Sequence, residues 1–70
     1  MARYYLTTNH RQGPFYSPEE ALREASRYIG FSGKDAVRVM EMQVGQSVTL
    51  AYGFSSVLIE CEPNEAVRTA

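Results

Sequence analysis

The chain has little cysteine and little histidine, and this limits the chemistry that it can carry. Its 70 residues include one cysteine, Cys61, and one histidine, His10. One cysteine cannot form a disulfide framework within the chain, so we expect a reducing, cytoplasmic compartment. One Cys and one His are also too few for a zinc site built from these ligands, and we predict no bound metal.

Long apolar segments and an excess of one charge are missing as well. No uninterrupted apolar run exceeds three residues, as in Val57-Leu58-Ile59, whereas a membrane-spanning helix needs about 20 apolar residues. The N-terminus lacks the apolar segment of a secretory signal, so we expect neither a membrane span nor a signal peptide. Seven Lys and Arg against eight Asp and Glu give a net charge of −1. This balance argues against a nucleic-acid binder that depends on a general basic excess.

Catalytic motifs are absent too, and the chain is short. With 44% apolar and 21% charged residues, the composition is that of one small folded domain. A chain of this length buries only about 60% of its extended surface, which is too little for a deep enclosed pocket. We therefore predict one domain over residues 1–62 with a C-terminal tail over 63–70, and expect no enzyme activity, cofactor or small-molecule substrate.

The clearest local signal is a helix that begins at Ser17. Serine is a good N-cap, Pro18 suits the first helical position, and Glu20 completes a capping box. Gly30 is expected to end the helix. Apolar residues at helical spacing would form its buried stripe: Ala21, Leu22, Ala25, Tyr28 and Ile29.

The remaining segments predict strands at 3–8, 36–43, 47–54 and 57–62, with a loop around Gly13-Pro14. In the last strand, Cys61 is expected in the core as a small apolar residue, while Glu60 and Glu62 face water. His10 is expected as an exposed loop histidine.

The predicted order is strand, helix, strand, strand, strand. Short links would make the last three strands an antiparallel meander, and the first strand would pair inside the sheet. One apolar helix stripe can cover one sheet face, so we expect a two-layer α+β fold. In this fold one helix packs on a four-stranded, mainly antiparallel sheet.

Two groups of cations are candidates for binding. Arg23 and Arg27 are four residues apart and would project from the same helix face. They either pair with Glu19 and Glu24 on that helix, or contact an acidic or phosphate-bearing partner. Near the N-terminus, arginines are interleaved with aromatic residues that either fill the core or stack nucleic-acid bases: Arg3, Tyr4, Tyr5, Arg11, Phe15 and Tyr16.

Three short motifs resemble a known family. Residues Ala21 to Gly33 fit A-x-R-x-A-S-[KR]-x-x-x-F-x-G, and Leu50-Ala51-Tyr52 and Ile59-Glu60-Cys61 follow at suitable spacing. In these motifs, and in the predicted order of its elements, the chain resembles the small phage-encoded anti-CRISPR proteins that inhibit type I-F systems. The resemblance covers about residues 21–62.

The resemblance implies a non-catalytic inhibitor of a type I CRISPR surveillance (Cascade) complex. Such an inhibitor would bind the repeated backbone subunit in the bacterial host and block target DNA, with at most weak or indirect nucleic-acid contact. Arg23 and Arg27 match basic helix positions of the family, and we add Phe31 and Lys34 as expected partner-binding residues. The last hairpin is uncharged here, unlike that of the family, so the subtype (I-F, I-C or another type I system) stays open.

A second function is compatible with the same sequence. A small phage nucleic-acid-binding or regulatory protein would use Arg3, Arg11 and the tyrosines. Binding to bare DNA or RNA, without binding to a surveillance complex, would distinguish it from the inhibitor.

Overall fold

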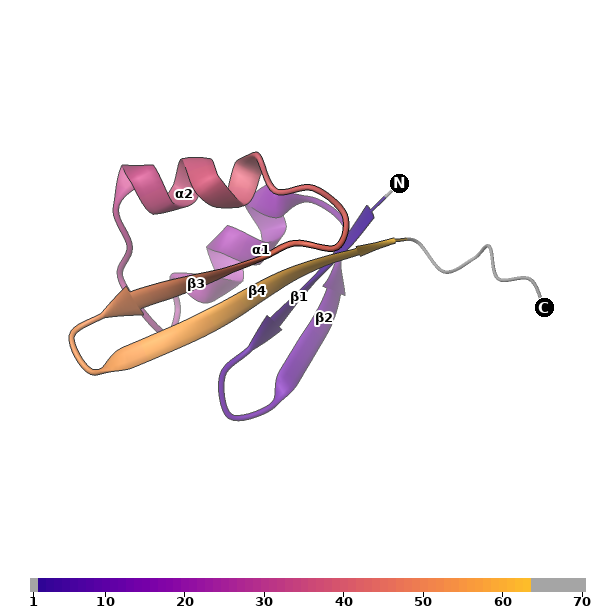
Figure 1. Ribbon diagram of the computed structural model, residues 1–70. Coiled ribbons are helices and arrows are strands. Elements are labelled where there is room, and N and C mark those ends of the chain that lie inside the picture. Colours follow the sequence, from indigo (N-terminus) through magenta and orange to yellow (C-terminus); the bar gives the residue numbers. More distant parts are fainter. Residues whose placement is uncertain (1, 64–70) are drawn as a thin grey trace.

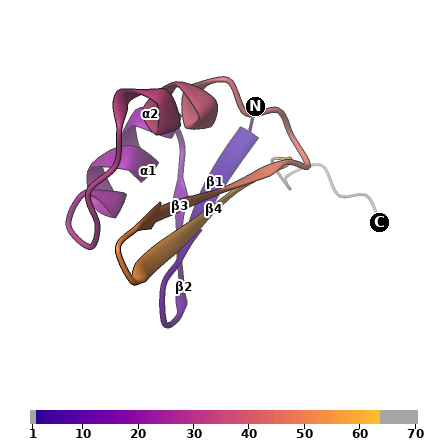
Figure 2. The same cartoon turned by 60° about the vertical axis from the view of Figure 1, so that its left-hand side comes forward.

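The computed structural model describes residues 2–63, which form two layers (Figure 1). One layer is a four-stranded antiparallel sheet, and the other consists of two helices that lie together on one face of it (Figure 2). The elements are β1 (Ala2–Thr7), β2 (Arg11–Phe15), α1 (Pro18–Ala25), α2 (Gly33–Met40), β3 (Ser47–Tyr52) and β4 (Ser55–Pro63). The predicted two-layer α+β class is confirmed. Of the predicted tail, Pro63 ends β4, and residues 64–70 lie outside the described residues.

The sheet order is β2-β1-β4-β3. The first strand does lie inside the sheet, where Tyr4 is opposite Cys61 and Leu6 is opposite Ile59. The predicted β-α-β-β-β order and the three-strand meander are wrong. One strand was missed before α1, and a predicted strand after it is a second helix.

The missed strand is β2, which contains the Gly13-Pro14 pair, where the sequence predicts a loop. Proline is tolerated in a strand at the edge of a sheet, because its missing N–H need not serve the ladder. Gly13 has a φ of +134°, and a Cβ there would come within 3.0 Å of the Tyr4 carbonyl oxygen. Glycine therefore allows β2 to approach β1 closely, although their register is irregular between Tyr4 and Leu6.

Helix α1 begins as predicted and ends earlier. The Glu20 N–H donates to Ser17 Oγ at 3.1 Å, and the Tyr16 N–H donates to Glu20 Oε1 at 3.2 Å. The helix ends at Ala25, not near Gly30. After it, the N–H groups of Arg27 and Tyr28 bond to carbonyls three residues back, at 3.0 and 2.9 Å. Tyr28 thus leaves the predicted buried stripe and is 47% exposed.

Helix α2 replaces the strand predicted over 36–43. Its β-branched Val37 and Val39 favour a strand by local propensity. Ser32 outweighs this preference as an N-cap, because its Oγ accepts from the Asp35 N–H at 3.2 Å. Packing of Val39, which is fully buried, then fixes the helix against the sheet.

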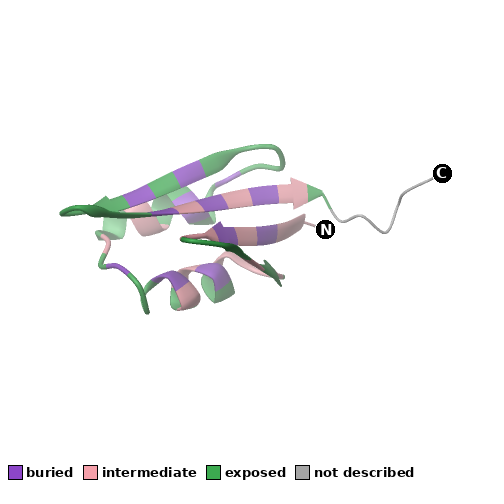
Figure 3. Cartoon of the chain, turned by 90° about the horizontal axis from the view of Figure 1, so that it is seen from below, coloured by how far each residue is buried: buried purple, intermediate pink, exposed green. Residues whose placement is uncertain are grey.

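The core lies between the two layers, and burial alternates along the strands (Figure 3). In β4, Val57, Ile59 and Cys61 face the core while Glu60 and Glu62 face away, as predicted. The buried residues form one cluster: Tyr4, Leu6, Ala21, Ala25, Ile29, Val39, Met42, Val48, Leu50, Val57, Ile59 and Cys61. One sheet face is therefore covered by helices, and the other is open.

Candidate functional site

The predicted arginines are exposed, but they do not share a regular helix face. Arg23 lies in α1, and no ion pair involves it among residues 2–63. The predicted helix includes both arginines, but Arg27 lies beyond the end of α1, in the hydrogen-bonded turn that follows it. Its guanidinium is 3.4 Å from the Glu24 carboxylate, so one of the two predicted pairs forms, while the predicted Glu19–Arg23 pair does not. An exposed pair of this kind contributes little free energy and leaves Arg27 able to contact a partner.

The other two predicted contact residues lie at the start of α2. Phe31, just before this helix, is half-buried and packs against the core cluster. Lys34 is exposed in the first turn of α2. Arg23 lies in α1 and Lys34 in α2, and these helices pack against each other on one face of the sheet (Figures 1 and 2). Arg27 lies in the segment that joins the two helices; this segment and the two helices are called the helix layer below. Phe31 contributes chiefly to the packing that positions this layer.

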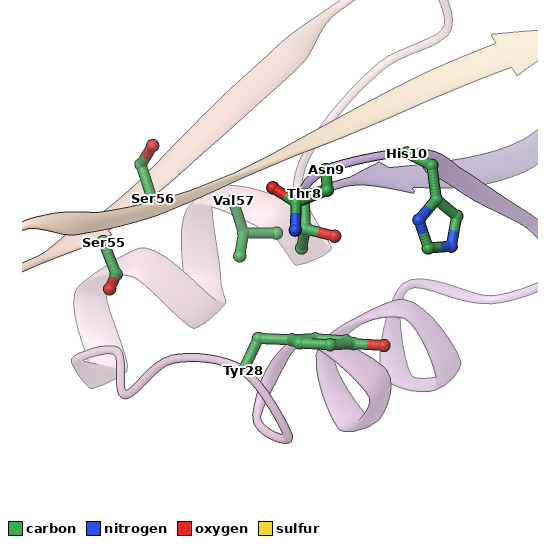
Figure 4. A pocket seen from close by; sticks show the side chains of 7 residues that line it. All are labelled: Thr8, Asn9, His10, Tyr28, Ser55, Ser56 and Val57. Atoms are coloured by element: carbon green, nitrogen blue, oxygen red, sulfur yellow. The ribbon is translucent and has the colours of Figure 1, made fainter.

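A pocket of about 480 Å³ is lined in part by Tyr28, the residue that follows Arg27 in the sequence (Figure 4). It is lined by Thr8, Asn9, His10, Tyr28, Ser55, Ser56 and Val57. The ring of Tyr28 forms one wall, and Thr8, Asn9 and Val57 lie across from it. Gln12 Nε2 donates to the Tyr28 hydroxyl at 3.1 Å, and that hydroxyl donates to Glu24 Oε2 at 3.4 Å. These bonds hold the ring in place.

The pocket suits a planar polar group from a partner. An aromatic face offers stacking, and the neighbouring hydroxyl, amide and imidazole groups offer hydrogen bonds. Sequence reasoning missed this pocket, although it had placed His10 in an exposed loop. The lining residues come from the β1–β2 turn, the segment after α1 and the start of β4, and only the tertiary fold joins these segments.

The open sheet face carries part of the second group of binding candidates, namely Arg3, Arg11 and Tyr5. The Arg11 guanidinium lies over the Tyr5 ring, 3.9 Å from its centroid. Arg11 Nε is 3.6 Å from Glu60, and Arg11 also pairs with Glu62. Arg3 lies 5.8 Å from the same ring. The cation and the aromatic ring are thus engaged with each other and with two carboxylates.

The other N-terminal aromatic residues divide between core and surface. Tyr4 is buried opposite Cys61, and Phe15 packs against the core cluster, while Tyr16 is exposed. Burial raises the pKa of Tyr4, and the adjacent Cys61 thiol adds to the rise. Cys61 is itself only 2% exposed, as expected for a core residue.

The described part of the chain contains neither a cluster of metal ligands nor a helix that could span a membrane. Within residues 2–63, no three His, Cys, Asp or Glu side chains come together in a way that could hold a metal ion. Neither described helix has the length and apolar character to cross a membrane.

No protein-family model, curated protein or solved structure was found to match the chain.

Proposed function

We propose that this protein is a non-catalytic inhibitor that binds a type I CRISPR surveillance complex and blocks target DNA. The expected partner is the repeated backbone subunit, in the cytoplasm of a bacterial host. The choice of target rests on the resemblance of the motifs in residues 21–33, 50–52 and 59–61. The predicted element order, which also entered the resemblance, is not that of the structure, so only the motifs support the target.

The observation that carries the binding function is the exposure of Arg23 and Arg27, together with the pocket at Tyr28, the residue that follows Arg27. Arg23 has no acidic partner within residues 2–63, and Arg27 has only the 3.4 Å pair with Glu24. Arginine and tyrosine are enriched among the few residues that dominate protein interfaces. The Arg27 guanidinium and the Tyr28 hydroxyl both contact the Glu24 carboxylate, at 3.4 Å each. Arg27 would give such an interface a charged anchor, and the pocket at Tyr28 would give it a binding site for a partner side chain.

The charges of the helix layer also support a site along a DNA path. A subunit that binds DNA presents lysines and arginines, and the exposed Glu19 at the start of α1 complements them. Arg23 and Arg27 then contact acidic groups or flat side chains next to that path. A surface of mixed sign fits a protein target better than it fits a bare phosphate backbone.

The nucleic-acid-binding alternative has less support. It would use Arg3, Arg11 and Tyr5 on the open face, but the Arg11 guanidinium already covers the Tyr5 ring. Glu60 and Glu62 add negative charge at the same place. Bases would have to displace Arg11 before stacking, and the carboxylates would repel phosphates.

The direct experiment mixes the purified protein with purified type I-F and type I-C complexes and follows co-elution. A mobility-shift assay then measures target DNA binding by each complex. We expect a stable assembly and loss of DNA binding with at least one type I complex. Binding to labelled DNA or RNA alone, with no assembly on any type I complex, would instead support the nucleic-acid alternative.

Variants test which residues carry the contact. The double variant Arg23→Ala with Arg27→Ala should weaken assembly by about 30-fold for each arginine and by up to about 1,000-fold in all, because each interface anchor is worth about 2 kcal/mol. Arg38→Ala is the matched control, since Arg38 is exposed and pairs with Asp35 at the same 3.4 Å and the same i,i+3 spacing. Equal inhibition by both variants would contradict the arginine assignment.

A further inference from the structure

The two edges of the sheet differ in how well they are protected against pairing. At one edge, β2 carries Pro14, a charged Arg11 and an irregular register with β1. At the other edge, β3 pairs within the described residues only with β4, in unbroken register. The six residues of β3 include no charge and no proline. Edge strands without such protection are templates for another strand.

The hydrogen-bond pattern between β3 and β4 determines which backbone groups of β3 face outward. Within an antiparallel ladder, alternate residues bond to the neighbouring strand. The Cys61 N–H donates to the Gln46 carbonyl at 3.0 Å, and this alternation continues through the register into β3. Val48, Leu50 and Tyr52 therefore bond to β4. The N–H and C=O groups of Ser47, Thr49 and Ala51 point toward the edge.

We propose that a second copy of this chain binds this edge. The β3 strands of the two copies pair antiparallel across a two-fold axis at Thr49 and join two four-stranded sheets into one. This inference does not depend on the proposed function. The pairing requires that the outward-facing N–H and C=O groups of one β3 strand lie opposite those of the other. With the axis at Thr49, the outward-facing residues Ser47, Thr49 and Ala51 of one copy lie opposite Ala51, Thr49 and Ser47 of the other.

The side chains along β3 are self-complementary in this arrangement. Thr49 lies opposite Thr49 of the second copy, and Ser47 lies opposite its Ala51. These side chains share the open face, and all are small and uncharged, so two strands can approach without clash or repulsion. Threonine pairs across strands are favourable.

Apolar residues just beyond the two ends of β3 also fit the two-fold arrangement. Val44, just before β3, is 53% exposed, and Phe54, in the hairpin turn after β3, is fully exposed. Each is five residues from Thr49 in the sequence. A two-fold axis at Thr49 therefore brings Val44 of one copy to the same end of the interface as Phe54 of the other. One exposed apolar residue from each copy would thus lie at each end of the interface.

These features favour a second copy over an unrelated strand. Val44 and Phe54 are equally distant from Thr49 in the sequence. A two-fold axis at Thr49 therefore places Val44 of each copy at the same end as Phe54 of the other. The joined sheet would then expose only its two β2 edges. Their proline and arginine block further addition, so assembly stops at the dimer.

The mass of the protein in solution is the first test. Light scattering or sedimentation equilibrium from micromolar to millimolar concentration should move the mass from 7.9 kDa toward twice that value. Thr49→Pro should keep the protein monomeric, because the Thr49 N–H faces the edge and does not serve the β3–β4 ladder. Thr49→Ser is the matched control that should still dimerise. If Thr49→Pro fails to fold, Thr49→Lys provides the same test by charge repulsion.

Disulfide cross-linking tests the register. Under oxidation, Thr49→Cys should form a dimer, because the Cα atoms of a hydrogen-bonded antiparallel pair are about 5.5 Å apart, within disulfide range. Ser47→Cys should not, because its two copies would lie about 13 Å apart along the strands. The native Cys61 is buried and gives little background.

Three outcomes would overturn the proposal. One is a monomer at every concentration. Another is equal cross-linking of the Thr49 and Ser47 variants, and the third is a dimer that persists in both Thr49→Pro and Thr49→Lys. A monomer whose Thr49→Lys variant loses binding to a surveillance complex would assign the edge to that complex and not to a second copy.

Discussion

The open sheet face and the helix layer both carry arginine, but they use it differently. On the open face, Arg11 contacts the Tyr5 ring and two carboxylates, Glu60 and Glu62. On the helix layer, neither Arg23 nor Lys34 forms an ion pair within residues 2–63, and Arg27 has one contact at 3.4 Å. On the open face Arg11 is thus engaged by neighbouring side chains, whereas on the helix layer Arg23 and Lys34 are exposed and form no ion pair within residues 2–63.

The difference follows from secondary structure. Strand register places Tyr5 opposite Glu60 and Arg3 opposite Glu62, so cross-strand neighbours are fixed by the backbone. On the helix layer no backbone pairing fixes such neighbours. Glu19 and Arg23 both lie in α1 and form no ion pair, while Arg27, beyond the end of α1, contacts Glu24 at 3.4 Å.

The largest effect should come from removing a core contact that joins the two layers. Ile59 is fully buried in the inner strand β4, and Ile59→Ala should lower the free energy of unfolding by about 2–5 kcal/mol. Leu58→Ala is the control on the open face and should cost about 1 kcal/mol or less. Urea unfolding followed by circular dichroism measures both. Equal losses would show that the open face contributes to stability as much as the core.

A smaller effect is expected from the pocket wall. Tyr28→Ala removes the aromatic face and should weaken binding to the surveillance complex about tenfold, which corresponds to about 1.4 kcal/mol. Tyr16→Ala is a suitable control, because Tyr16 is also exposed and does not line the pocket. Titration calorimetry with each variant measures the change. Unchanged affinity for Tyr28→Ala would remove the pocket from the interface.

Arg11→Ala tests the opposite side of the comparison. It should lower the free energy of unfolding by about 0.5–1 kcal/mol, because the Arg11 side chain is 46% exposed and solvent screens its ion pairs. Added salt should shrink the difference from the wild-type protein. Inhibition should stay unchanged, and a loss of inhibition would place the open face within the functional surface.

The smallest expected effect concerns alkaline pH. The pKa of buried Tyr4 lies above its ordinary value of 10.0, so the unfolded chain releases this proton at lower pH than the folded protein. The folded protein then binds more protons, and the free energy of unfolding falls as the pH rises above that value. Tyr4→Phe removes this contribution. The stability difference between wild type and Tyr4→Phe should therefore change above pH 10.0 and be constant below it, and a constant difference at every pH would contradict this.

Much of the fold follows from local patterns in the sequence. The alternation in Val57 to Cys61 predicted β4, and Ser17 with Glu20 predicted the start of α1. Two elements did not follow, because tertiary structure overrode local preference. Pro14 is tolerated only because β2 lies at a sheet edge, and the valines of α2 are helical because Ser32 caps them and Val39 packs on the sheet.

The candidate site, like the fold, could be predicted from the sequence only in part. The exposure of Arg23 and Arg27 agrees with their place off the apolar stripe of the predicted helix, although Arg27 lies beyond α1 in the structure. The pocket does not follow from the sequence, because Tyr28 meets the β1–β2 turn only when the chain is folded. Tyr28 even fits the apolar stripe of a longer helix, and only the end of α1 at Ala25 turns it outward.

The most direct test of the inhibitor function is a competition measurement on a type I surveillance complex. The complex is prepared with and without bound target DNA, and binding of this protein to each form is measured. We expect tight binding to the free complex and little binding to the DNA-loaded one, since the protein and the DNA would occupy the same path. Equal binding to both forms, or no binding to either, would contradict the proposed mechanism.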